Sequence, residues 1–249
     1  MPDAQPITDT GSQRGSALLG LLLTVVIGVG VVAGLGAYLH RQTTDAQSSI
    51  TATVIGKVDT PKGSMTHATL TLGVYADAVS SGAHGKDGGP FPDYVSYGPA
   101  THLILPAHSL ITITINGYDG GERLSNPFFG RVVGTMDGTM TVNGQVVSAV
   151  PADQVQHTFT LHGVPSPNQD PLFVNIPLTK QTDDVMEHFD ATGKLPAPTV
   201  TTFSFYTGGP GEYVFNCEYP CGDGTYAKFG AAMGKFGYMS GTVSVVDHV

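Results

Sequence analysis

The sequence predicts an all-β domain preceded by one transmembrane helix, and three observations support this prediction. The 249 residues include 33 glycines and 17 prolines, and only 12% are charged, which is typical of a turn-rich β architecture. Several segments alternate apolar and polar residues with the period of two expected for strands. Residues 15–39 contain no charged residue. The predicted organisation is a disordered tail (1–14), a transmembrane helix (15–39), a linker (40–63) and a β-domain (64–249).

The uncharged stretch is long enough to cross a membrane. A helix of about 20 residues spans the hydrocarbon core, whereas the apolar region of a cleaved signal peptide usually has about 7–15 residues. The length therefore favours an uncleaved single anchor over a signal peptide. Arg14 precedes the stretch and Arg41 follows it, so the flanking charges do not define the orientation.

The first strands of the β-domain are marked by clear alternation. Residues 67–75 place apolar side chains and threonines on opposite faces, and residues 102–121 do the same with isoleucines. The intervening segment, 76–99, is rich in Gly, Pro, Ser and Asp and is predicted to be a long loop. The apolar faces consist of Ala68, Leu70, Leu72 and Val74, and of Ile111, Ile113 and Ile115.

Local signals define the remaining elements. Residues 121–155 are predicted to contain a β-hairpin, because Asn143-Gly144 is a strong two-residue turn signal. Thr182 is a suitable N-cap before two aspartates and predicts a short connecting helix within residues 180–199. Three further strands are expected at 202–206, 211–217 and 241–246.

A histidine lies on the apolar face of another predicted strand. In the extended segment that starts at residue 155, His157 shares a face with Phe159 and Leu161. A histidine in such a position is more often a hydrogen-bonded core residue than a metal ligand, so the pattern alone favours the core. His162 falls on the opposite face and is predicted to face solvent.

The two cysteines of the chain are the strongest functional signal. Cys217 and Cys221 lie at the start of a glycine-rich loop between two predicted strands, with Met233 and Met239 beyond. Thiolates and thioethers are ligands of soft, redox-active copper. The alternative is a disulfide, because three intervening residues allow the Cα separation of about 5.5 Å that a disulfide needs. For each methionine, core packing is an equally good explanation.

Composition and motifs exclude several function classes. The formal net charge is −9 and the sequence has no cluster of Lys or Arg, so a nucleic acid is a poor candidate partner. The sequence contains no serine nucleophile elbow, no HExxH motif, no zinc-type cysteine spacing and no phosphate-binding glycine loop. The protein is therefore predicted not to be an enzyme.

Four segments together resemble the cupredoxin superfamily. In that superfamily a strand ending in Asn and Asp precedes a histidine-bearing strand, a Pro-Gly-x-Tyr strand leads to a cysteine, and a Met-Gly-like turn leads into a Val-rich strand. The resemblance covers about residues 100–246 and implies a cupredoxin-like Greek-key β-sandwich. The segments are LPAHSLITITINGYD (105–119), QHTFTLHG (156–163), PGEYVFNCEYPCG (210–222) and GYMSGTVSVV (237–246).

The cysteine spacing is most similar to that of the copper domain of cytochrome c oxidase subunit II, which is membrane-anchored and extracytoplasmic. This resemblance implies copper bound by His157, Cys217 and Cys221, with Met233 or Met239 as the thioether ligand. Three phenylalanines would exclude water from such a site: Phe159, Phe215 and Phe229.

The loop departs from that family in one respect. No histidine lies between Cys221 and Met239, where the oxidase domain has one. A second imidazole would have to come from elsewhere in the chain, and a single imidazole among sulfur ligands favours Cu(I) and suits copper carriage. The candidates for the second imidazole are His102, His108 and His162.

The sequence thus predicts a single-pass protein of the cell membrane with an extracytoplasmic copper-binding domain. Its function would be electron transfer or copper delivery, with a redox protein or a respiratory complex as partner. The alternative is a metal-free interaction or accessory-subunit domain in which Cys217 and Cys221 form a disulfide.

Overall fold

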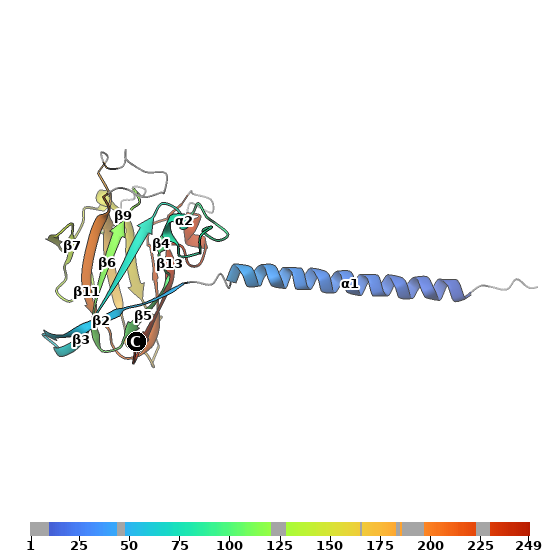
Figure 1. The fold of residues 1–249 in the computed structure, drawn as a ribbon, viewed down its shortest axis with the longest axis horizontal. Coiled ribbons are helices and arrows are strands. Elements are labelled where there is room, and N and C mark those ends of the chain that lie inside the picture. The colour runs from blue at the N-terminus through green and yellow to red at the C-terminus, as the bar shows by residue number, and fades with distance from the viewer. Residues whose placement is uncertain are drawn as a thin grey trace, which may run out of the picture. The chain divides into compact units, whose positions relative to one another are not determined.

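The computed structural model describes residues 10–43, 48–120, 128–164, 166–182, 185, 197–222 and 230–249. The chain divides into two compact units, Met1–Asp45 and Ala46–Val249. The first unit contains helix α1 (Thr10–Thr43), and the second is a β-domain (Figure 1).

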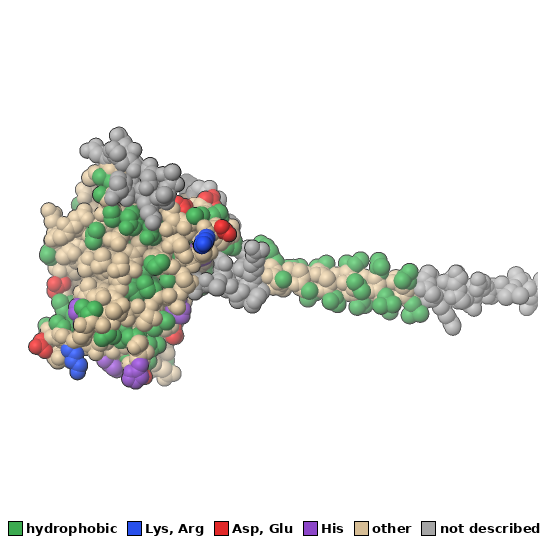
Figure 2. Space-filling model, viewed as in Figure 1, with side chains coloured by type: hydrophobic (Ala, Val, Ile, Leu, Met, Phe, Trp, Pro, Cys, Tyr) green, Lys and Arg blue, Asp and Glu red, His purple; other side chains and the backbone are tan. Residues whose placement is uncertain are grey.

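Helix α1 contains an apolar stretch, Leu18–Tyr38, of 21 residues with a mean hydropathy of 2.7. Its side chains are exposed, and Figure 2 shows hydrophobic groups along the described part of the helix. At about 1.5 Å per residue, this length matches the roughly 30 Å hydrocarbon core of a membrane. A signal sequence shares these properties, so what is confirmed is the apolar helix itself. Helix α1 also extends beyond the predicted range of 15–39 at both ends.

The β-domain consists of two sheets. The six-stranded sheet has the order β1 (Ser49–Thr51), β5 (His102–Pro106), β13 (Ser240–Val246), β12 (Gly211–Asn216), β9 (Val155–His162) and β10 (Phe173–Thr179). The second sheet has the order β2 (Thr53–Thr60), β3 (Gly63–Tyr75), β6 (Ser109–Gly117), β11 (Thr199–Tyr206), β7 (Met140–Val142) and β8 (Gln145–Val147), and β4 (Ser96–Gly98) pairs with β3.

Side chains from both sheets form one core. Phe159 of β9 and Phe203 of β11 are both buried, with ring centroids 5.7 Å apart. In β6 the isoleucines at 111, 113 and 115 are at most 1% exposed, whereas Thr112 and Thr114 between them are partly exposed. This two-sheet sandwich, together with helix α1, confirms the predicted fold class.

The predicted hairpin is also confirmed. Asn143 and Gly144 connect β7 to β8 with φ angles of 48° and 82°. Positive φ at both central residues is what a tight turn between twisted strands needs, and Asn-Gly adopts it at low cost.

The prediction of a linker at 40–63 is wrong for most of its length. Helix α1 continues to Thr43, and β1 and β2 lie within the range. Strand β2 pairs with β3 but is mostly exposed, so its sequence, TVIGKVDT, carries no buried face and lacks the alternation that reveals half-buried strands.

Two other predicted segments differ in outcome. The expected loop at 76–99 contains helix α2 (Ala78–Ser81), capped by the Asp77 carboxylate, and strand β4. The expected connecting helix falls mainly on residues 183–196, of which only Val185 is described, so this prediction lies outside the described residues. Two 3-10 turns, Ala152–Gln154 and Ala232–Gly234, complete the elements.

Replacing Ile113 by alanine should destabilise the β-domain by about 2–5 kcal/mol, because Ile113 is fully buried and the substitution leaves a cavity. The change in the free energy of unfolding can be measured by urea denaturation. Thr71→Ala, at an exposed position of β3, is the matched control and should change it by no more than about 0.5 kcal/mol. Equal effects of the two substitutions would contradict the assigned core face.

Candidate metal centre

The centre lies where two neighbouring strands of the six-stranded sheet meet the loop that follows β12. Strands β9 and β12 pair in antiparallel register, with Leu161 opposite Phe215 and Thr160 opposite Asn216. His157 lies near the start of β9, and Cys217 directly follows the end of β12. This pairing therefore brings residues 60 positions apart in sequence next to each other.

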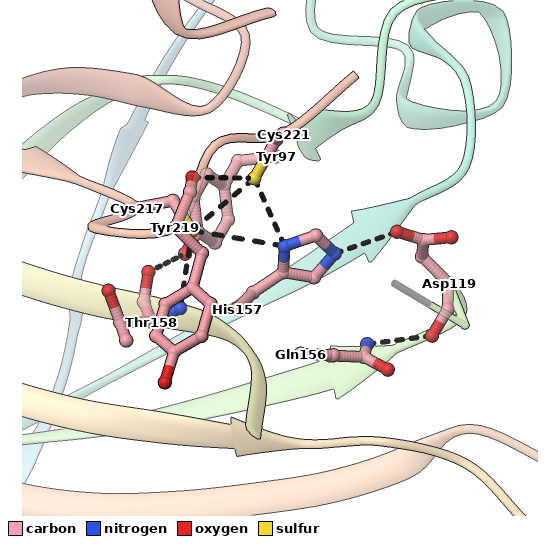
Figure 3. A network of polar contacts seen from close by, with 8 residues as sticks. All are labelled: Tyr97, Asp119, Gln156, His157, Thr158, Cys217, Tyr219 and Cys221. Carbon is pink, nitrogen blue, oxygen red and sulfur yellow. Dashed lines mark hydrogen bonds and ion pairs between the residues drawn. The ribbon is translucent and has the colours of Figure 1, made fainter. Parts of the chain in front are cut away.

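Three ligand atoms converge at this point (Figure 3). His157 Nδ1 lies 3.2 Å from Cys221 Sγ and 3.8 Å from Cys217 Sγ, and the two sulfurs are 3.4 Å apart. All three residues are at most 4% exposed. Within the described part of the chain, this is the one group of His, Cys, Asp and Glu side chains whose ligand atoms all lie within 4.8 Å of one another. No disulfide joins the cysteines.

The spacing of the donors suits a single metal ion. An ion bound tetrahedrally by sulfur at about 2.3 Å and by nitrogen at about 2.1 Å, as zinc is, holds its donors roughly 3.6–3.8 Å apart. The observed separations of 3.2, 3.4 and 3.8 Å come within a few tenths of an ångström of that range. His157, Cys217 and Cys221 thus form a site with the geometry and the soft donors of a metal centre.

The backbone around the sulfurs is held by hydrogen bonds. The Thr158 N–H donates to Cys217 Sγ at 3.3 Å, and the Glu218 N–H donates to Thr158 Oγ1 at 2.8 Å. The Cys221 thiol donates to the Tyr219 carbonyl at 3.2 Å. These bonds fix the turn that carries both cysteines against β9.

Asp119 is a member of the centre that the sequence did not reveal. Its carboxylate lies 2.7 Å from His157 Nε2, on the side of the ring opposite the sulfurs, and its carbonyl accepts a hydrogen bond from the Gln156 side chain at 2.7 Å (Figure 3). The family resemblance includes an aspartate after the strand at this point, but gave it no role.

Hydrogen bonds and charges within the cluster raise the pKa of His157 and lower the pKa of Cys217. Burial alone would lower the pKa of His157, but the hydrogen bond with Asp119 and the proximity of Cys217 outweigh it and raise the pKa from 6.5 to about 10. Burial alone would raise the pKa of the Cys217 thiol, but hydrogen bonds with Cys221 and His157 and the imidazolium charge hold it well below its usual value of 9.0. The metal-free cluster therefore pairs an imidazolium with a thiolate.

Tyr97 lies near both cysteines and packs against buried phenylalanines. Tyr97, Phe159 and Phe215 are fully buried, and the Tyr97 ring lies 5.3 Å from that of Phe215. The Tyr97 hydroxyl donates to the Thr158 carbonyl at 2.7 Å, and burial together with the two cysteines holds its pKa well above 10.0. Two of the three phenylalanines expected to exclude water are thus in the buried core, and Phe229 lies outside the described residues.

The two methionines predicted as alternative thioether ligands both belong to or pack against the core. Met239 is fully buried and its carbonyl accepts the Cys217 N–H at 2.9 Å, while Met233 is partly buried and packs against the core. Among the described residues, none of the candidate second histidines, His102, His108 and His162, belongs to the converging group. His102 instead bonds Ser244 Oγ at 3.1 Å.

In the metal-free protein, Cys217 should be a thiolate at neutral pH, because the adjacent imidazolium stabilises the negative charge. Ultraviolet thiolate absorbance followed against pH is expected to show one thiolate persisting well below pH 9.0. His157→Gln removes the positive charge and should raise the pKa of Cys217, whereas the control His102→Gln should leave it unchanged. Identical titrations in all three proteins would contradict the ion pair.

Comparisons with known proteins give structural similarities alone, since no family model and no curated protein matches the chain. A structure of rusticyanin, a copper protein, is 12% identical over 86% of this chain and 94% of its own, with a TM-score of 0.34. Rusticyanin from Thiobacillus ferrooxidans is 14% identical over 78% and 86%, with a TM-score of 0.33. Auracyanin from the photosynthetic bacterium Roseiflexus castenholzii is 14% identical over 72% and 96%, with a TM-score of 0.29.

Rusticyanin and auracyanin are cupredoxins, the superfamily that the sequence segments resemble. The closer resemblance to cytochrome c oxidase subunit II stays a prediction. Identities and TM-scores this low say nothing about the chemistry of the present chain, which follows from its own side chains.

Proposed function

We propose that this chain is a membrane-anchored, extracytoplasmic, cupredoxin-like protein that binds copper for electron transfer or copper delivery. The observation that carries the proposal is the convergence of His157 Nδ1 and two cysteine sulfurs, all buried, within 4.8 Å of one another. Buried groups of this kind need hydrogen-bond or metal partners, and these three point at a common centre.

The donor set favours copper in its reduced state. Thiolates select soft ions such as Cu(I), and one imidazole beside two sulfurs gives Cu(II) less nitrogen coordination than a site with two imidazoles. Met233 or Met239 would add a thioether, and the carbonyl of Met239 accepts the Cys217 N–H. When bound, copper would supply the one-electron chemistry, and the chain would supply the buried, preformed donors.

The anchor and the charge of the domain support the location and partners that we propose. A helix of membrane-spanning length precedes the β-domain in the chain, and the net charge of −9 argues against nucleic acid. A membrane-bound redox protein or respiratory complex is therefore the class of partner that we favour. We propose no enzymatic activity.

The second candidate function is a metal-free interaction or accessory-subunit domain with a Cys217–Cys221 disulfide. The observation that favours it is the short Sγ–Sγ separation of 3.4 Å, since a small movement in an oxidising compartment would join the sulfurs. A disulfide would remove both thiolates from the metal centre, so the two functions exclude each other in any one molecule.

Copper binding should depend on each of the three converging side chains. The full-length protein, reconstituted without oxygen, is expected to retain copper in a competition titration and to show thiolate-to-copper absorption after oxidation. Cys217→Ser and Cys221→Ser should each weaken copper binding, and the double variant should abolish that absorption because it has no thiolate. His157→Gln should weaken binding at least about tenfold.

His162→Gln is the matched control, because His162 lies on the same strand outside the converging group. It should bind copper as the unchanged protein does. Failure of the unchanged protein to retain copper, together with an intact mass two hydrogens below that of the dithiol without reductant, would favour the disulfide-linked module instead.

The N-terminal helix should hold the protein in the membrane. The full-length chain is expected to sediment with membranes and to resist extraction by high salt, because about 20 apolar residues insert stably in the hydrocarbon core. Deleting residues 1–45 should release a folded β-domain into the soluble fraction. Release of the full-length protein by salt, or a mature protein that lacks the helix, would contradict the anchor.

A further inference from the structure

The carboxylate of Asp119 lies behind the proposed ligand His157. Asp119 comes two residues after the end of β6, and its side chain is 17% exposed, compared with 3% for His157. Its Oδ2 is 2.7 Å from His157 Nε2, and its carbonyl is bonded by Gln156, the neighbour of His157 in the chain. Two bonds therefore tie this short segment to the start of β9 (Figure 3).

This contact determines which nitrogen of His157 is available to a metal. A carboxylate accepts hydrogen bonds, so the imidazole keeps its proton on Nε2 and donates it to Asp119. The lone pair of the neutral ring then lies on Nδ1, which is the nitrogen that faces the two sulfurs. A partner of this kind fixes both the tautomer and the orientation of a metal-binding histidine.

The charge of the carboxylate has a second consequence. A negative group bonded to the far side of the ring increases the basicity of the donor nitrogen. A stronger donor stabilises the more highly charged ion, so Asp119 favours Cu(II) relative to Cu(I). The effect of Asp119 on the relative stability of the two copper states is therefore opposite to that of the two thiolates, which favour Cu(I).

We propose that Asp119 is a positioning residue that holds His157 as an Nδ1 donor and lowers the reduction potential of the bound copper. The effect on the reduction potential rests on the proposed copper-binding function. The selection of the tautomer is a property of the metal-free protein.

The test compares two aspartate-to-asparagine substitutions in the full-length protein in detergent. Asp119→Asn removes the charge and retains a side chain of the same shape. Asp170→Asn is the matched control, because the Asp170 carboxylate also accepts one hydrogen bond, from the Gly209 N–H at 2.7 Å, near the opposite end of β12. His157→Gln and the double variant Asp119→Asn/His157→Gln complete a double-mutant cycle.

Asp119→Asn should weaken Cu(II) binding about 10–100-fold and Cu(I) binding less. If the difference is about tenfold, the potential rises by ~59 mV for a one-electron couple. Asp170→Asn should leave both affinities and the potential unchanged. In the His157→Gln background, Asp119→Asn should have no further effect on Cu(II) affinity, because it acts through the imidazole. NMR of the imidazole nitrogens in the metal-free protein, at a pH where His157 is neutral, should show Nε2–H in the unchanged protein. Asp119→Leu, whose side chain has no hydrogen-bond acceptor, should lose this single tautomer.

Unchanged affinities and potential in Asp119→Asn, or an undiminished effect in the His157→Gln background, would overturn the inference while leaving copper binding intact. If the unchanged protein binds no copper, the proposed function and the effect on potential fail together. The NMR comparison of the unchanged protein with Asp119→Leu then decides the positioning role on its own: the same tautomer in both proteins overturns it, and loss of the Nε2–H tautomer in Asp119→Leu supports it.

Discussion

The antiparallel register between β9 and β12 is the constraint on which the rest of the centre depends. Leu161 opposite Phe215 sets the pairing, and continuing it places Thr158 beside Glu218, where the Glu218 N–H bonds Thr158 Oγ1. A slip of one residue would turn the side chains of β12 to the other face of the sheet and separate Cys217 from His157. Phe215 opposes such a slip, because it would leave the core and lose its stacking on Phe159, whose ring centroid lies 4.9 Å away.

Much of the β-domain could be predicted from local pattern, because its central strands have one buried and one exposed face. Strands β3 and β6 show this alternation in their sequences, and the structure buries the predicted faces. Strand β2 has no such signal, because it forms an exposed extension whose only requirement is backbone pairing with β3. The sequence could not reveal a strand such as β2, which pairs through its backbone and has no alternation of apolar and polar residues.

Some residues of the centre could likewise be predicted from the sequence, whereas Asp119 could not. The cysteines stood out because the chain has only two, and His157 because its strand resembled a copper-binding one, although its apolar face alone favoured a core residue. Asp119 could not be identified, since it lies 38 positions from His157 and meets it only after β6 and β9 are placed in the sandwich. The sequence supplied ligand types, whereas the partner of the imidazole came from tertiary structure.

Internal charge pairing explains how so polar a cluster is tolerated in the core. Burying an isolated thiolate or imidazolium costs several kcal/mol. Here the imidazolium of His157 lies between the Cys217 thiolate and the Asp119 carboxylate, and the Thr158 N–H also donates to the sulfur. The cluster thus offsets its own desolvation before any ion arrives. A metal ion binding at Nδ1 would take the place of that nitrogen's proton, so the same geometry serves both states.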